Sequence, residues 1–337
     1  MRIYMRTWLH SLPKVELHIH LEGSIPLATL WQLMQQYGGD PDVPDMTALT
    51  RKFQYRDFPQ FINTWVWKNR FIRTAADFTT IAAAVAQDWA DQNICYVESH
   101  YSPTDFARHG LTIGEITRAI RAGLNQVPAV TVNLIADVVR DSSIDRAMHT
   151  VETVAELGEY GVIGIGLGGS EQTHPPEPFA PVFARARQLG LRTTAHAGEA
   201  AGAESIWGAL AALGAERIGH ATRANTDPKL CDFFVTQQIP LEMCPLSNVR
   251  TGVVADIASH PIADFIKRGM LVTVNTDDPK MFNNTLVDEY TQLMEHFHLP
   301  PATICQLIDN AVTASWLSDD EKTTLRATLQ RHPSWVA

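Results

Sequence analysis

Short apolar segments alternate with amphipathic helical segments along most of this 337-residue chain. Strands joined by a helix pair in parallel, because a parallel crossover needs about a helix's length of chain. Eight such units predict a (β/α)₈ barrel, also called a TIM barrel. A doubly wound open sheet is the alternative, but the glycine fingerprint of dinucleotide-binding folds is missing after the first strand. The predicted strands are Val15–Leu21, Cys95–Tyr101, Val130–Val138, Val162–Leu167, Leu191–Ala197, Arg217–His220, Pro240–Cys244 and Leu271–Asp277.

Helices are predicted between most of these strands from apolar residues that recur at three- and four-residue spacing. In the segment 77–92, for example, Phe78, Ile81, Val85 and Trp89 fall on one helical face. The predicted helices are Asp77–Gln92, Ile113–Gln126, Ser142–Tyr160, Pro178–Leu189, Ala203–Leu213, Asp227–Gln237 and Ile262–Arg268.

Two regions exceed a minimal barrel, although we expect the whole chain, 1–337, to form a single domain. The segment 24–75 follows the first strand and contains at least two predicted helices, Leu27–Tyr37 and Asp57–Arg73. We expect it to form a lid or pocket wall, because the loops after barrel strands build the active-site face. The segment 283–337 is predicted to be helical and to seal the barrel. An apolar stripe in the second insertion helix is expected to pack on the barrel rather than to contact substrate: Phe58, Phe61, Ile62, Trp65 and Val66.

Composition excludes several classes of function. The formal net charge of −10 and the lack of a Lys/Arg cluster argue against nucleic-acid binding. No apolar run reaches the roughly 18 residues of a membrane-spanning helix, and the segment 1–12 lacks the apolar core of a signal peptide. The cysteines are far apart and are expected to be reduced thiols in a cytoplasmic protein: Cys95, Cys231, Cys244 and Cys305.

Residues that bind metals or transfer protons stand at the ends of several predicted strands. His18 and His20 alternate with apolar residues, so they project from the same face of the first strand. His196, His220 and the pair Asp277–Asp278 end the fifth, sixth and eighth strands. The ends of parallel barrel strands converge on one rim, so we expect these side chains to meet there.

Three histidines and one carboxylate form the protein ligand set of a catalytic zinc ion with an open position for water. We predict that His18, His20, His196 and Asp277 bind one Zn²⁺ per chain. A second metal would need a bridging group, usually a modified lysine after the fourth strand, and that strand instead runs into Gly168-Gly-Ser-Glu171. The metal would lower the pKa of its bound water and provide hydroxide near neutral pH.

The remaining polar residues at the rim suggest acid and base groups. His220 would orient the hydroxide and accept its proton. Glu199, with its pKa raised in a dry pocket, would protonate the leaving side of a substrate, and Asp278 would accept a hydrogen bond from it. Each has an ordinary alternative, because His220 can be a core histidine, Asp277–Asp278 a capped turn, and Glu199 a solvated acid at a helix start.

The other histidines are expected at the surface, apart from His100, which lies near the end of the second strand and stays ambiguous. The expected surface histidines are His10, His109, His149, His174, His260, His296, His298 and His332.

From Leu12 to beyond the eighth predicted strand, the chain resembles the adenosine deaminase family. The matching motifs are His-Ile-His-Leu-Glu-Gly (18–23), Gly-Leu-Gly-Gly-Ser-Glu (166–171), His-Ala-Gly-Glu (196–199), Arg-Ile-Gly-His (217–220), Cys-Pro-Leu-Ser-Asn (244–248) and Asn-Thr-Asp-Asp-Pro (275–279). The family comprises metal-dependent (β/α)₈ hydrolases, usually with zinc, that replace the 6-amino group of a purine with oxygen and release ammonia.

The resemblance implies the same metal ligands and assigns contacts to the substrate. Glu199 would donate a proton to purine N1, and His220 would handle the hydroxide that attacks C6. The resemblance further implies contacts from Asp278 on the N7 side, the Gly169 backbone near N3, Glu22 near the sugar, and His20 beside the substrate.

Different residues around the expected purine position favour different substrates. Gly168–Gly169 and the segment 247–252 favour adenosine or 2′-deoxyadenosine, because missing side chains leave room beside the N3/N9 edge. Glu22 favours adenine, since the adenine branch commonly carries glutamate there. Modified nucleosides such as 6-amino-6-deoxyfutalosine stay open, and Arg250 would meet an acidic substituent or pair with a structural carboxylate. The oligomeric state is not predicted.

Two other classes of function fit less well. A binding or signalling module without turnover would lose metal ligands, and the predicted set is complete. A barrel hydrolase of amides or phosphoesters is disfavoured by the lone proton donor Glu199 and by the absent bridging lysine.

Overall fold

Eight parallel strands form the centre of the structure, a computed structural model that describes residues 2–55 and 58–336. They pair in sequence order from first to last, and every pair is parallel. The strands are β1 (Lys14–His20), β2 (Ile94–Tyr101), β3 (Thr131–Val139), β4 (Val162–Gly168), β5 (Arg192–Ala197), β6 (Arg217–His220), β7 (Leu241–Met243) and β8 (Val272–Val274).

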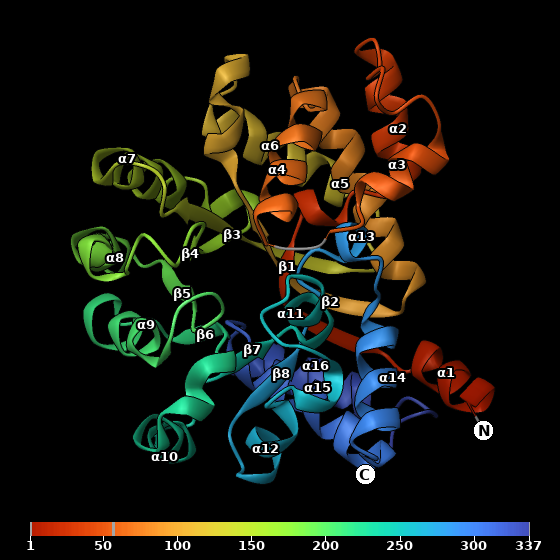
Figure 1. Ribbon diagram of the computed structural model, residues 1–337, viewed down its shortest axis with the longest axis vertical. Coiled ribbons are helices and arrows are strands. Elements are labelled where there is room, and N and C mark those ends of the chain that lie inside the picture. The colour runs from red at the N-terminus through yellow and green to blue at the C-terminus, as the bar shows by residue number, and fades with distance from the viewer. Residues whose placement is uncertain (1, 56–57, 337) are drawn as a thin grey trace.

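The last strand returns to the first through the turn that follows β8. Asp277 forms a bridge with Ile19 of β1, in which the Asp277 N–H donates to the His18 carbonyl (3.1 Å) and the His20 N–H donates to the Asp277 carbonyl (2.8 Å). The sheet is therefore a nearly closed barrel, as predicted, and not an open sheet (Figure 1). The eighth strand is shorter than predicted because the chain turns after Val274, and Asp277 has a φ of 65°.

Helices lie between the strands close to the predicted positions. For α5, a capping box between Thr74 and Asp77 marks the start. The predicted helix 142–160 ends early, at Ala155, and a separate 3₁₀ turn follows at Gly158–Tyr160. These helices are α5 (Ala75–Asp91), α6 (Ile113–Leu124), α7 (Ile144–Ala155), α8 (Ala180–Gln188), α9 (Ala203–Gly208), α10 (Pro228–Gln237) and α12 (Ile262–Lys267).

The connection from β1 to β2 carries three helices before α5, and these gather on one side of the barrel in Figure 1. They are α2 (Leu27–Gln36), α3 (Met46–Lys52) and α4 (Phe58–Lys68), of which α3 was not predicted. Asp57, the predicted start of the second insertion helix, and the side chain of Phe58 lie outside the described residues.

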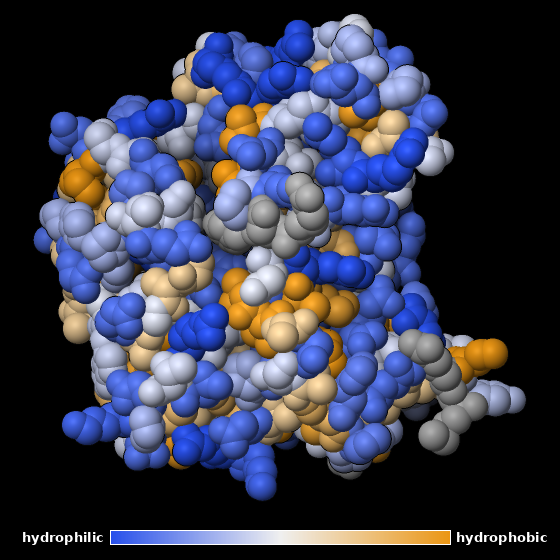
Figure 2. Space-filling view, viewed as in Figure 1, coloured by the Kyte–Doolittle hydropathy of each residue, from blue (hydrophilic) through white to orange (hydrophobic). Residues whose placement is uncertain are grey.

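Short helices and C-terminal helices complete the molecule. Helix α15 contacts β1 and β8, and α1 packs against α14. Helix α1 projects from the edge in Figure 2 and exposes Ile3 and Tyr4, whereas polar side chains cover most of the visible face. No helix in the described part of the chain has the length and apolar character needed to cross a bilayer. These elements are α1 (Arg2–Ser11), α11 (Pro245–Arg250), α13 (Pro279–Phe282), α14 (Leu286–His296), α15 (Pro301–Ala314) and α16 (Asp319–Gln330).

Candidate active site

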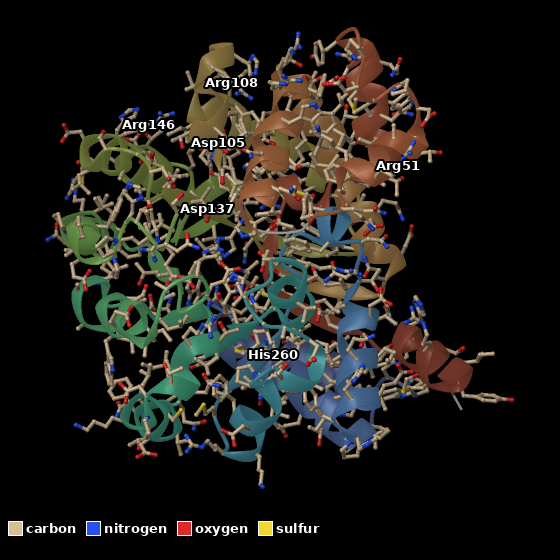
Figure 3. All side chains as sticks on the ribbon, in the orientation of Figure 1. Arg51, Asp105, Arg108, Asp137, Arg146 and His260 are labelled. Atoms are coloured by element: carbon tan, nitrogen blue, oxygen red, sulfur yellow. The ribbon has the colours of Figure 1, made fainter. Side chains whose placement is uncertain are left out.

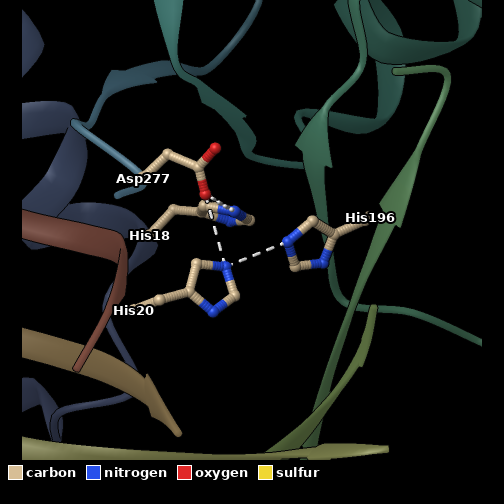
Figure 4. Close-up of side chains that lie close together, drawn as sticks. All are labelled: His18, His20, His196 and Asp277. Atoms are coloured by element: carbon tan, nitrogen blue, oxygen red, sulfur yellow. Dashed lines mark hydrogen bonds and ion pairs between the residues drawn. The ribbon is translucent and has the colours of Figure 1, made fainter. Parts of the chain in front are cut away.

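Four side chains from distant parts of the sequence meet at the C-terminal end of the barrel (Figure 4). His18 and His20 come from β1, His196 comes from β5, and Asp277 comes from the turn after β8. Their ligand atoms all lie within 4.8 Å of one another, and all four residues are buried. Nε2 of His20 lies 3.2 Å from Nε2 of His196 and 3.3 Å from Oδ1 of Asp277. The residues predicted as metal ligands are thus brought together.

Each of these four side chains has one polar atom held by a neighbour outside the cluster. Such bonds orient the other polar atom toward a shared centre, as in known metal sites. Nε2 of His18 is buried and has no hydrogen-bond partner among the described residues. The outer partners are Glu242 for His18 (2.9 Å), Asp137 for His20 (3.3 Å), the Leu167 carbonyl for His196 (3.0 Å) and Ser247 for Asp277 (2.7 Å). Three histidines and one carboxylate whose inward atoms face one another fit a divalent ion such as zinc.

The electrostatics of the cluster also fit a cation. Burial alone would lower the pKa of His18, but the nearby carboxylates of Asp277 (3.6 Å) and Glu242 (2.9 Å) raise it to about 9. Burial would raise the pKa of Asp277, but hydrogen bonds from His18 and His20 hold it well below its usual value. The cluster therefore attracts positive charge to its centre, and a metal ion would take the place of these protons.

A second group of potential ligands, formed by His18, His220 and Cys244, fits a metal less well. Metal binding by cysteine requires the thiolate. Burial raises the pKa of the Cys244 thiol well above its usual value.

Glu199 lies beside the cluster, in the turn between β5 and α9. Burial, and then the charges of Asp277 and Glu171, raise its pKa well above the usual value and so favour the protonated carboxyl group. Oε2 of Glu199 is 3.5 Å from Nε2 of His220, the last residue of β6. Burial lowers the pKa of His220 to about 3, so its ring is neutral.

A carboxylate from the next loop shapes the turn that carries Glu199. The side chain of Glu171 is buried and accepts hydrogen bonds from four consecutive backbone N–H groups. The donors are Gly198 (2.6 Å), Glu199 (3.1 Å), Ala200 (2.7 Å) and Ala201 (3.1 Å).

A cavity of about 370 Å³ opens over the cluster. Of the predicted site residues, His20, Gly169, His196, Glu199, His220, Asp277 and Asp278 line it. Helix α4 forms one wall with Phe61, Ile62, Trp65 and Val66. These side chains were expected to pack on the barrel rather than to contact substrate. Phe61 stacks on Phe282, with 5.0 Å between ring centroids, and all four side chains line the cavity, so this helix forms a pocket wall. The other lining residues are Ser102, Asp105, Asp137, Val139, Asp141, Gly168, Ser170 and Thr251.

Glu22 and Asp278 differ in their relation to the cavity. Glu22 is buried outside its lining, where Oε1 accepts the Ser102 N–H (3.0 Å) and burial raises the pKa to about 7. Asp278 lines the cavity, and burial followed by the charge of Asp277 raises its pKa to about 8. A Cβ atom on Gly23 would lie 1.7 Å from Oδ1 of Asp278, so glycine at this position makes room for that carboxyl group.

The adenosine deaminase family model matches residues 13–332. The chain belongs to this family. Like other members it is a metal-dependent aminohydrolase, and it acts on adenine or an adenine-like nucleoside.

Individual relatives differ in the substrate that they are named for. An aminodeoxyfutalosine deaminase from Streptomyces avermitilis is 34% identical over 340 residues, which cover 99% of this chain and 95% of that protein. An adenine deaminase from Bordetella avium is 34% identical over 313 residues, which cover 92% of this chain and 99% of that protein. The crystal structure of an adenine deaminase from Arthrobacter aurescens matches with a TM-score of 0.90 at 29% identity. The match covers 95% of this chain and 98% of that protein. An amidohydrolase from Burkholderia ambifaria, solved with bound zinc, matches with a TM-score of 0.88 at 26% identity. The match covers 96% of this chain and 91% of that protein.

Several residues of this deaminase site were missed by sequence reasoning. Asp137 and Glu242 lie inside predicted strands. A carboxylate in a strand that is buried on both faces needs a polar partner. This requirement was the signal in the sequence that could have identified them. The ambiguous His100 pairs with Asp137 (2.7 Å) and is not one of the four clustered ligands. His260 was expected at the surface, but it is 3% exposed and lies 3.2 Å from Asn248. Figure 3 labels Asp105 and, below it, Asp137 in the upper half of the view, and His260 in the lower half.

Proposed function

We propose that this enzyme converts adenosine or 2′-deoxyadenosine to inosine or 2′-deoxyinosine and ammonia. The observation that carries the proposal is the set of polar side chains that line the cavity besides Glu199 and the histidines. Ser102, Asp105, Asp141 and Ser170 belong to this lining and offer partners for sugar hydroxyls. Gly168 and Gly169 line the cavity without side chains, next to His196 and Asp141 respectively, and so leave room for a sugar.

The lining also argues against a phosphorylated substrate. Of the described residues that line the cavity, none is a lysine or an arginine, the usual partners of phosphate. Arg250, considered from the sequence as a partner for an acidic substituent, is exposed and does not line the cavity.

In this proposal, His18, His20, His196 and Asp277 hold one zinc ion. When bound, the ion would lower the pKa of a water molecule at its open position and so supply a nucleophile near neutral pH.

Glu199 donates its proton to purine N1, so negative charge does not build up in the ring as oxygen adds at C6. Asp278 bonds the N7 side, and the Gly169 backbone lies near N3. His20 lies beside the substrate, and His220 contacts the attacking oxygen. Glu22 supports the sugar side indirectly through its bond to the Ser102 N–H. The cavity walls hold the purine in place, and this positioning supplies much of the rate enhancement.

Adenine and 6-amino-6-deoxyfutalosine are second candidates, because relatives that are 34% identical are named for deaminating adenine and aminodeoxyfutalosine. A panel of adenosine, 2′-deoxyadenosine, adenine, methylthioadenosine and 6-amino-6-deoxyfutalosine separates them by kcat/KM. We expect the highest value for adenosine or 2′-deoxyadenosine. A higher value for adenine or for the futalosine compound would replace the proposed substrate.

The metal assignment has its own test. Asp277→Ala removes one proposed ligand, so we expect the zinc content of the purified protein to fall. Unchanged zinc by elemental analysis would remove Asp277 from the ligand set.

A further inference from the structure

A chain of hydrogen bonds leads from a backbone amide to the ring of His220. The Ile262 N–H donates to Nδ1 of His260 (3.2 Å). Nε2 of His260 lies 3.2 Å from Oδ1 of Asn248, and Nδ2 of Asn248 lies 3.0 Å from Nδ1 of His220. All three side chains are buried. Ile262 is the first residue of α12, so its N–H has no partner within the helix and is free for this bond.

The direction of every bond in this chain follows from its first donor. A backbone N–H only donates, so Nδ1 of His260 is the acceptor. A neutral imidazole has one donor and one acceptor nitrogen, so the proton of His260 is on Nε2. This Nε2–H group donates to Oδ1 of Asn248. The amide group of Asn248 then donates from Nδ2 to Nδ1 of His220. His220 therefore carries its own proton on Nε2.

Both histidines are neutral, which this deduction requires. The hydrogen bonds themselves show this, because Nδ1 of each ring accepts a hydrogen bond and so carries no proton. The donor is the Ile262 N–H for His260 and the Asn248 side chain for His220.

We propose that Asn248 and His260 are positioning residues that hold neutral His220 as the Nε2–H tautomer. Nε2 faces the cavity, 3.5 Å from Oε2 of Glu199. His220 then donates a hydrogen bond toward the reacting oxygen, which orients that oxygen and stabilises the charge that develops on it. This differs from the expectation from sequence, because a nitrogen that already carries a proton does not accept one from the attacking water. The catalytic consequence rests on the proposed function, whereas the tautomer does not.

The tautomer is read directly by ¹⁵N NMR of histidine-labelled protein as purified, with the His220 signals assigned by their loss in His220→Asn. We expect a protonated Nε2 and an unprotonated Nδ1. A protonated Nδ1 would overturn the proposal. This measurement needs no turnover, so a wild-type protein that deaminates no aminopurine would refute the proposed function without affecting the tautomer.

Asn248→Asp reverses the chain with little change of shape. An aspartate oxygen replaces the donor Nδ2, so we expect the His220 proton to move to Nδ1. With the aminopurine that the wild type turns over best, kcat should fall about 100-fold, as for loss of one donor to a developing oxyanion, while KM stays within about threefold. Asn310→Asp is the matched control. Asn310 donates to the carbonyl of Val272, the first residue of β8, at the end of the strand away from the cavity. This substitution should leave kcat unchanged.

Two substitutions of His260 test the chain without an added charge. His260→Gln places an amide donor near the position of Nε2 and should retain most of kcat, whereas His260→Leu should give mixed His220 tautomers and a lower kcat. Wild-type kcat in both His260→Leu and Asn248→Asp would overturn the positioning role. The same holds if His220 keeps one tautomer in every variant.

Discussion

Glu199 occupies surroundings that disfavour its charged form. It is buried, and the carboxylates of Asp277 and Glu171 lie close enough to raise its pKa further. A carboxyl group that keeps its proton near pH 7 is able to donate that proton to a weakly basic ring nitrogen.

Replacing Glu199 by glutamine removes this proton but keeps the shape of the side chain. We expect kcat for Glu199→Gln to fall by about 1,000-fold, within the range for loss of a general acid. Zinc content should be unchanged, because Glu199 is not a proposed ligand. Ammonia release and elemental analysis measure the two quantities. Glu204→Gln, at an exposed glutamate of α9, is the control, and a Glu199→Gln enzyme with wild-type kcat would contradict the assignment.

Gly23 affects the site through space alone. A methyl group on its Cα would lie 1.7 Å from Oδ1 of Asp278, so the carboxyl group would have to move. We expect kcat/KM for Gly23→Ala to fall about 100-fold, the effect of misplacing a contact group by about 1 Å, with an unchanged circular dichroism spectrum. Gly158→Ala is the control, because nothing lies within 4 Å of its Cβ position. Equal kcat/KM for Gly23→Ala and wild type would show that activity does not depend on the present position of the Asp278 carboxyl group.

The turn between β5 and α9 owes its shape to a side chain from another loop. Its N–H groups at 198–201 point to the Glu171 carboxylate. Successive N–H groups around one anion form a compact and rigid unit. The carbonyl of Gly198 is held as well, by the Thr222 hydroxyl (2.6 Å).

Glu171→Gln places an amide NH₂ where backbone donors need an acceptor. We expect faster hydrogen exchange at 198–201 and a kcat lower by about tenfold or more, because Glu199 loses its fixed position. Mass spectrometry of exchanged peptides and steady-state kinetics measure these effects. Asp77→Asn is a matched control, since Asp77 is equally buried and accepts the Arg73 and Thr74 N–H groups away from the cavity. Slow exchange in Glu171→Gln would contradict this account.

At the scale of the whole molecule, a series of buried charged side chains connects the barrel interior to the four proposed metal ligands. Arg217 pairs with Glu98 (2.5 Å) and Glu242 (2.7 Å), and its guanidinium lies 3.6 Å from the ring centroid of Trp316. Glu242 also bonds His18. Burial would raise the pKa of Glu242, but Arg217 and His18 lower it to about 2, so the carboxylate stays charged and orients His18.

Lys14 at the start of β1 makes the stability of the fold depend on pH. It is fully buried and donates to the carbonyls of Leu9 (2.8 Å) and Leu12 (2.5 Å), and burial lowers its pKa to about 7. Between that value and the unfolded pKa of about 10.4, the unfolded state binds more protons than the folded state. This difference makes the free energy of unfolding rise with pH across that window.

In Lys14→Met this contribution is absent. We therefore expect the unfolding free energy of the wild type, relative to Lys14→Met, to increase from pH 7 to pH 10 with a slope of up to about 1.4 kcal/mol per pH unit. Urea denaturation at several pH values measures it. A constant difference between the two proteins over this range would contradict the lowered pKa.

The barrel and the meeting of the four proposed metal ligands were predictable because they depend on local periodicity. Apolar runs and helical spacing indicate strands and helices, and parallel closure brings the C-terminal ends of β1, β5 and β8 to one rim. His18 and His196 lie in β1 and β5, and Asp277 lies in the turn just after β8. Glu199 and Asp278 come near the rim because they directly follow these residues in the chain. A sequence pattern therefore suffices wherever a residue's place depends on its own strand.

The contacts that orient the proposed ligands and Glu199 were not predictable. They join side chains that are far apart in the sequence and follow no periodic pattern. Asp137 with His20, Glu242 with His18, and Glu171 with the turn at 198–201 are fixed by how loops and strands pack around a common centre. His260 shows the limit most clearly, because its own neighbours in the chain suggest a surface position. It is buried where the short turn Ile257–Ser259, directly before it, packs against α11, the helix that contains Asn248. Burial obliges its two nitrogens to find hydrogen-bond partners, and these connect it to His220.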